Sequence, residues 1–153
     1  MTTALTTTLS DTDLALIEQV HGHLCPMVLL GARTAKKARQ LVAVPGDNPR
    51  LYGYYRGYGC AIDGIQIYSG CTWGNQNLVL LRGRNFSFIL TVEGAGEGVM
   101  VSPRPQLLEQ IRGEKTPESR SALMEMFTSA PDEELLEIEA VMDMGTLSRF
   151  PGN

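Results

Sequence analysis

Residues 77–102, NLVLLRGRNFSFILTVEGAGEGVMVS, decide the fold class of this 153-residue chain. Three runs rich in apolar residues predict strands, over 77–82, 85–93 and 98–102. The links between these runs are short and contain glycine, and they read Arg82-Gly83-Arg84 and Gly94-Ala95-Gly96. Because short turns join antiparallel strands, this segment predicts an antiparallel sheet.

Helical patterns lie on both sides of this strand run. We predict helices over 11–20, 26–42 and 61–68 before it, and over 103–111, 117–128 and 131–140 after it. The aromatic segment 51–58 predicts a further strand, which follows a turn at 45–49. The order of helices, strands and helices indicates an α+β fold, in which an antiparallel sheet packs with helices.

Local signals mark the ends of several of these helices. Ser10 and Asp13 have the spacing of an N-terminal capping pair. Pro26 suits the first turn of a helix, where its missing N–H group has no cost. Ser69-Gly70 is typical of a helix end.

The composition fits one domain of ordinary size. Apolar residues make up 43% of the chain, and no linker divides it. We expect a flexible, threonine-rich N-terminus over 1–10 and a single domain over 11–153. No apolar run reaches the roughly 18 residues of a membrane span, and the first residues lack a secretory signal. We therefore expect a cytoplasmic protein that does not bind membranes.

The charge distribution argues against nucleic-acid binding. The net charge is −4, whereas a nucleic-acid binder needs a concentrated basic face. A basic cluster does occur on the predicted helix over 26–42, and we expect it to form a solvated helix face; its members are Arg33, Lys36, Lys37 and Arg39.

The first candidate site is His21-Gly22-His23-Leu24-Cys25-Pro26, which holds both histidines of the chain. In extended backbone alternate residues point to the same side, so His21, His23 and Cys25 can converge. Imidazole and thiolate are ligands of zinc and of other transition metals. Cys25 also directly precedes a helix, whose dipole favours a reactive thiolate. The structural alternative is a buried Cys25 at the helix start and a hydrogen-bonding His21.

Cys60 and Cys71 flank the predicted helix over 61–68. A helix of about ten residues spans roughly 15 Å, so both thiols reach one metal only if the loop after the helix doubles back. Otherwise one of the two is a buried apolar residue. The three cysteines form no C-x-x-C pair and accompany no export signal, so we expect no disulfide.

Four polar residues accompany these cysteines. Asp63 and Gln66 share one face of the 61–68 helix, and Thr72 and Asn77 belong to a polar loop that follows it. We expect all four to line the same cleft and to contact a bound cofactor. Helix capping and turn formation are the structural alternatives.

Three ordered motifs carry a resemblance to a known family. They are His21-Gly22-His23-Leu24-Cys25-Pro26, Cys60-Ala61-Ile62-Asp63-Gly64-Ile65-Gln66 and Gly70-Cys71-Thr72-Trp73-Gly74-Asn75-Gln76-Asn77-Leu78. Together they resemble the FmdE family, named for a component of molybdenum formylmethanofuran dehydrogenase, over about residues 11–140. Met27 replaces the usual glycine of that family, and Asn75-Gln76 replaces Lys-Gly, which removes a positive charge. We expect the core domain alone, without the four-cysteine zinc ribbon of some members.

The resemblance implies an α+β core, a homodimer and a metal pocket; the implied metal ligands are His21, His23, Cys25, Cys60 and Cys71. We interpret the chain as a metal-binding protein that takes a transition metal, zinc when isolated, or a metal-bound cofactor. The family name links it to molybdenum-dependent one-carbon metabolism, with a metalloenzyme or a cofactor as partner. Two alternatives stay open. One is an enzyme with Cys25 or Cys60 as nucleophile, a histidine base and Asp63 as its orienter; the other is a non-catalytic interaction subunit.

Overall fold

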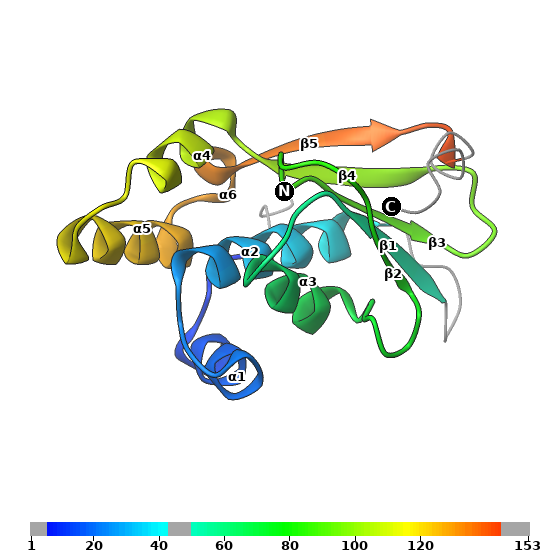
Figure 1. Ribbon diagram of the computed structural model, residues 1–153. Coiled ribbons are helices and arrows are strands. Elements are labelled where there is room, and N and C mark those ends of the chain that lie inside the picture. The colour runs from blue at the N-terminus through cyan, green and yellow to red at the C-terminus, as the bar shows by residue number, and fades with distance from the viewer. Residues whose placement is uncertain (1–5, 43–49, 145–153) are drawn as a thin grey trace, which may run out of the picture.

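The structure, a computed structural model, describes residues 6–42 and 50–144, so the predicted turn at 45–49 lies outside the described residues. Its elements are α1 (Asp11–His21), α2 (Pro26–Leu41), β1 (Leu51–Tyr55), α3 (Ala61–Ser69), β2 (Leu78–Leu80), β3 (Phe88–Val92), β4 (Gly98–Pro103), α4 (Pro105–Arg112), α5 (Pro117–Ser129), α6 (Asp132–Leu135) and β5 (Leu136–Val141). Figure 1 shows α2 and α3 between the sheet and α1, with α4, α5 and α6 gathered at one end. The α+β class is confirmed.

The sheet is mixed, and this corrects the expectation of a wholly antiparallel one. Its strand order is β2-β1-β3-β4-β5. Strand β2 pairs with β1 in parallel, with Gly53 opposite Leu78, whereas the other three pairs are antiparallel. The physical reason is the connection: β1 leads through α3 into β2, and a helical crossover returns the chain in the same direction. The segment 77–82 therefore lies beside β1 and not beside β3.

The predicted helix over 131–140 is wrong beyond its first turn. Only Asp132–Leu135 is helical, and Leu136–Val141 forms strand β5, which pairs antiparallel with β4. The sequence LEIEAV alternates apolar and acidic residues, which is the period of a strand. The acidic residues at the start of this segment correctly predicted the beginning of a helix. They also led to the prediction that the helix continues, although the residues that follow alternate as in a strand.

A close contact between α2 and α3 organises the helical layer. Gly31 of α2 and Gly64 of α3 stand where the two backbones meet. A Cβ atom at residue 31 would overlap the carbonyl oxygen of Ala61, and one at residue 64 would overlap that of Val28. No residue other than glycine fits at either position. The small residues of α2 repeat at helical spacing, at Gly31, Ala35 and Ala38, and this small-residue face is buried within the protomer.

The buried guanidinium of Arg33 joins three parts of the chain. Its Nε donates a hydrogen bond to Thr7 Oγ1 at 3.1 Å, and its Nη1 donates to the carbonyl oxygen of Phe127 at 2.9 Å. Its Nη2 donates to the carbonyl oxygen of Ala130 at 2.7 Å and to Asp132 Oδ1 at 2.8 Å. Arg33 is fully buried, and the expected solvated basic face is wrong at this position.

The lysines of α2 form ion pairs with neighbouring elements. Lys36 Nζ lies 3.1 Å from Asp13 Oδ2 on α1, and Lys37 Nζ lies 3.0 Å from Asp132 Oδ2. Arg39 is exposed, as the sequence predicted, whereas Lys36 and Lys37 help to hold the helical layer together. This is the physical reason why they do not form a free basic surface.

The N-terminal segment packs against the core before α1 begins. Thr7 is buried, and its hydroxyl donates to Asp132 Oδ1 at 2.6 Å. Leu9 is also buried, and its N–H group donates to the carbonyl oxygen of Thr128 at 2.9 Å. The packed part of the chain therefore includes residues that the sequence assigned to a flexible N-terminus. The predicted capping pair of Ser10 and Asp13 is present.

Among the residues that the structure describes, no single helix has the length and apolar character to cross a membrane. Helices α1 and α2 satisfy both criteria only when taken together, and they are bent by 117° where they meet.

We predict that Asp132→Ala destabilises the protein by about 3–5 kcal/mol, because it leaves the buried Arg33 guanidinium without its counter-ion. Urea denaturation followed by circular dichroism measures the change. Glu109→Ala is the matched control, since it removes an exposed carboxylate that pairs with Arg112 at the surface. It should change the free energy of unfolding by less than about 0.5 kcal/mol.

The same ion network predicts how stability depends on pH. Burial raises the pKa of Asp132, but hydrogen bonds from Thr7, Arg33 and Lys37 outweigh burial and hold it well below its usual 3.8. A carboxylate whose pKa is lowered by folding stabilises the protein above its unfolded pKa, and this stability is lost as pH falls. Unfolding free energy should therefore decline below about pH 4. Asp132→Ala should flatten that decline, and an unchanged slope would contradict the assignment.

Candidate metal centre

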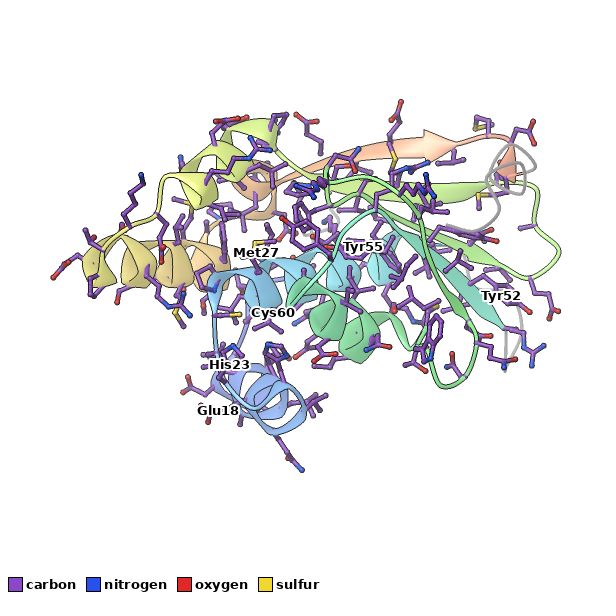
Figure 2. The ribbon with its side chains drawn as sticks, viewed as in Figure 1. Glu18, His23, Met27, Tyr52, Tyr55 and Cys60 are labelled. Carbon is purple, nitrogen blue, oxygen red and sulfur yellow. The ribbon has the colours of Figure 1, made fainter. Side chains whose placement is uncertain are left out.

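The chemically active residues lie where α1 ends and where α2 and α3 begin. Helix α1 ends at His21, and Gly22 turns the chain with a φ of 92°. Cys25 is the extended residue before Pro26, which starts α2, and Cys60 directly precedes α3. Figure 2 shows His23 beside the end of α1, close to Cys60 at the start of α3. The first turns of α2 and α3 meet at the glycine contact, which brings Cys25 and Cys60 together.

Four of the five predicted ligands form one cluster. One donor atom from each of His21, His23, Cys25 and Cys60 lies within 4.8 Å of the others. The two imidazole rings lie with their centroids 4.4 Å apart. In a tetrahedral zinc site the ligand atoms are about 3.3–3.8 Å from one another, given the usual bond lengths. Small side-chain movements would thus suffice to bring all four donors to one ion.

The imidazole of His21 is the most informative member of this cluster. Its Nδ1 lies 2.7 Å from Asp63 Oδ2, a distance at which the ring donates its proton to the carboxylate. Its Nε2 is buried and has no hydrogen-bond partner among the described atoms. Buried polar atoms without a partner are rare, and this one is the ring nitrogen left with a free lone pair. A carboxylate that orients a histidine in this way is typical of metal sites.

The thiol of Cys60 is held in its neutral form when no cation is present. Burial raises its pKa, and the neighbouring Cys25 thiol and Asp63 carboxylate raise it further. A metal cation reverses this preference, because it attracts the thiolate and favours loss of the proton. These surroundings therefore suit Cys60 better to the role of a metal ligand than to that of a free nucleophile.

Asp63 and Gln66 lie beside the cluster, and they connect it to the loop after α3. Gln66 Nε2 donates to Asp63 Oδ1 at 3.1 Å. Its Oε1 accepts from the backbone N–H of Trp73 at 2.9 Å. These residues hold His21 in position from outside the cluster.

Thr72 and Asn77 take part in hydrogen bonds within their own loop. The Oδ1 atom of Asn75 accepts from the backbone N–H groups of both residues, at 2.9 and 3.0 Å. Asn77 also accepts a hydrogen bond from Gly53 N–H through its carbonyl oxygen. The loop is built by its own side chains, which is the structural alternative raised from the sequence.

Cys71 lies away from the other four ligands, and its inclusion in the cluster is corrected. It is fully buried in the hydrophobic core, beyond the C-terminal end of α3, next to Ser69. Gly70, with a φ of 73°, ends α3, and a Cβ atom at Gly53 of β1 would lie 3.3 Å from the Cβ of Cys71, which places this cysteine beside the sheet. Burial raises the pKa of its thiol. The three cysteines are free, as predicted.

A cavity of about 410 Å³ adjoins the cluster, and no pattern in the sequence predicts it. His23, Cys25 and Cys60 line it together with residues from elements distant in sequence; among these are Met27, Tyr58, Arg84, Phe86, Ile111 and Arg120. Met27, which replaces the family's usual glycine, therefore faces the cavity. Asn75 and Gln76 are not among its lining residues. No local motif in 105–123 signals a site.

Comparisons with known proteins give the family and the fold. A family model described as "FmdE, Molybdenum formylmethanofuran dehydrogenase operon" matches residues 20–137. A solved structure of a tungsten formylmethanofuran dehydrogenase FmdE-like protein from Syntrophus aciditrophicus has the same fold. Its TM-score is 0.70 at 22% identity, over 92% of this chain and 80% of that one.

A curated relative matches a shorter region. A probable S-adenosyl-L-methionine-binding protein from Archaeoglobus fulgidus is 35% identical over 69 residues. The match includes 42% of this chain and 19% of that protein. The chain thus spans about a fifth of this relative's length.

We predict that the Asp63→Ala variant still binds the metal, but with an affinity about 10–100-fold lower, because the carboxylate orients His21 without being a ligand. Competition of the zinc-loaded protein with a chromophoric chelator measures the affinity. Glu18→Ala removes an exposed carboxylate of α1 and is the control, which should bind zinc like the wild type. A complete loss of zinc from Asp63→Ala at saturating zinc would instead make Asp63 a ligand.

Proposed function

This chain belongs to the FmdE family, and we propose that its working part is a metal centre formed by His21, His23, Cys25 and Cys60. The observation that carries the proposal is the buried Nε2 of His21, which has no partner among the described atoms and belongs to a four-donor cluster. The cost of burying an unpaired ring nitrogen is removed when a cation takes its lone pair. Asp63 on the opposite ring nitrogen fixes the tautomer that leaves Nε2 free.

The donor set favours zinc in the isolated protein. Two imidazoles and two thiolates are a common zinc ligand set, and soft thiolates select against magnesium and calcium. The metal would supply positive charge, which stabilises the two thiolates. Two further roles belong to the protein itself. Asp63 orients His21, and burial limits the access of water to Cys25.

The biological role that we propose is binding of a transition metal or a metal-bound cofactor for molybdenum- or tungsten-dependent one-carbon metabolism. The family description and the name of the Syntrophus protein support this context. A metalloenzyme or its cofactor would then be the partner. Three free cysteines fit a reducing compartment, and we propose the cytoplasm.

The thiolate enzyme is the second candidate, and one observation favours it. Asp63 and His21 form the oriented acid–imidazole pair that such a mechanism needs. Two observations oppose it: the pKa of Cys60 is raised, and Cys25 is only 5% exposed. Metal-free protein with one thiol that reacts rapidly with iodoacetamide at neutral pH would favour this candidate over the metal centre.

We predict that His21→Ala and Cys60→Ser each lower bound metal from about one equivalent to below about 0.2 after identical dialysis, because each removes one of four donors. Inductively coupled plasma mass spectrometry of protein purified without added chelator measures the content. Cys71→Ser is the matched control, since it changes a thiol outside the cluster. Wild-type metal content in Cys60→Ser, or its loss in Cys71→Ser alone, would contradict the proposed ligand set.

We also propose that the chain forms a homodimer, and the exposed edge of β5 now supports this. The small-residue face of α2 does not support it, because α3 covers that face. Ile138 on β5 is 51% exposed, and Met142 just after β5 is 73% exposed. The free edge of a strand that also exposes an apolar side chain gains by pairing with a second copy.

We predict a dimer at micromolar concentration in analytical ultracentrifugation. Ile138→Lys should shift it to the monomer, because a charge at the edge opposes pairing. Val20→Lys changes an equally exposed apolar residue on α1 and is the control. A wild-type monomer at this concentration would refute the dimer.

A further inference from the structure

We infer that the cavity beside the cluster binds an amphipathic organic anion, with an apolar body and a carboxylate or phosphate group, and that this anion lies against the metal. The contact with the metal rests on the proposed function, whereas the recognition of the anion rests on the cavity itself. The cavity holds about 410 Å³, which is the size of small-molecule sites.

Apolar side chains form much of the cavity wall. Met27, Phe86, Leu108, Ile111 and Leu123 all line it, and they come from α2, the segment before β3, α4 and α5. Phe86 packs against Tyr58 with ring centroids 5.3 Å apart, which adds an aromatic surface. Such a wall favours a ligand with an apolar or aromatic body. A small inorganic ion would make no contact with most of this apolar surface.

The charged residues of the cavity are mostly positive. Arg84, Arg112 and Arg120 line it, against one carboxylate, Glu114. Arg120 Nη1 lies 3.8 Å from Glu114, and Arg112 Nη1 lies 2.5 Å from Glu109, so these two arginines already have partners. The lining therefore keeps an excess of positive charge, which attracts an anion.

Arg84 is the residue that we assign to the anion. Its guanidinium lies over the ring of Tyr58, 5.5 Å from the centroid, and no carboxylate pairs with it in the described part of the chain. Stacking on the ring holds the planar group and leaves its N–H donors free. A guanidinium presents a fork that matches the two oxygens of a carboxylate or a phosphate.

The metal ligands border the same space. His23, Cys25 and Cys60 line the cavity, whereas His21 does not. A ligand that fills the cavity therefore contacts the three ligand residues and comes next to the ion that they would hold. A zinc ion held by four protein ligands has a complete tetrahedral shell, so the anion would lie against the metal site without binding the ion itself. The geometry thus selects for an anion with a polar group at Arg84 and an apolar body between the walls.

Isothermal titration calorimetry with matched probes tests this inference. The probes are 2-naphthoate, 1-naphthyl phosphate, the neutral 2-naphthalenemethanol and inorganic phosphate. We expect both naphthyl anions to bind at least about tenfold more tightly than the neutral probe, because a charged hydrogen bond is added. We expect no measurable binding of inorganic phosphate, which lacks the apolar body. The tighter of the two anions identifies carboxylate or phosphate as the preferred group.

Two variants and a control locate the binding. Arg84→Gln should remove the preference for anions, a loss of about tenfold. Met27→Ala should weaken both naphthyl anions about fivefold through lost apolar contact. Arg82→Gln changes a neighbouring exposed arginine outside the cavity and should bind like the wild type. Equal binding of anions and neutral probe, or equal effects of Arg84→Gln and Arg82→Gln, would overturn the inference.

Metal analysis of the same samples separates this inference from the proposed function. Metal-loaded protein should bind the anions more tightly than Cys60→Ser protein, and Arg84→Gln should keep its metal. Equal affinities with and without metal would overturn the metal contact but leave the anion site. Wild-type protein that holds no metal but binds anions through Arg84 would overturn the proposed function alone.

Discussion

The contact between Gly31 and Gly64 is the constraint on which the site depends. It lies within the first two turns of both α2 and α3, and it allows the two backbones to touch. The residues that precede these helices are Cys25 and Cys60, so the same contact that packs the helices brings the two thiols together. A side chain at either glycine would push the helix starts apart and open the cluster. Packing and chemistry are therefore linked through two residues that carry no functional group.

Much of the fold could be predicted because its signals are local. Pro26 starts α2, Ser10 and Asp13 cap α1, and Gly70 ends α3 in the left-handed conformation. The pairing of β2 could not be predicted from turn length, since it depends on the α3 crossover and not on the link that follows β2. Strand β5 had a readable alternation, but its acidic start resembled a helix.

In the candidate site, too, local sequence predicts the residues that are close along the chain but not the contacts between distant segments. His21, His23 and Cys25 lie within five residues, and their convergence follows from the extended backbone between two helices. Cys60 joins them through tertiary packing, which spacing cannot reveal. Cys71 closely follows the other end of α3 and lies in the core. The buried Arg33 was missed because its partners come from the two ends of the chain, at Thr7 and Asp132.

The hydrogen bonds that run outward from His21 have an optical consequence. His21 contacts Asp63, Asp63 contacts Gln66, and Gln66 accepts from the backbone of Trp73. Trp73 is the single tryptophan of the chain, and it is 75% exposed. These hydrogen bonds end at its backbone N–H group, so they hold the residue in place and leave its exposed indole as a native fluorophore with no competing indole emission. Its quantum yield and its quenching by iodide give access to the state of the cluster in dilute solution without any attached label.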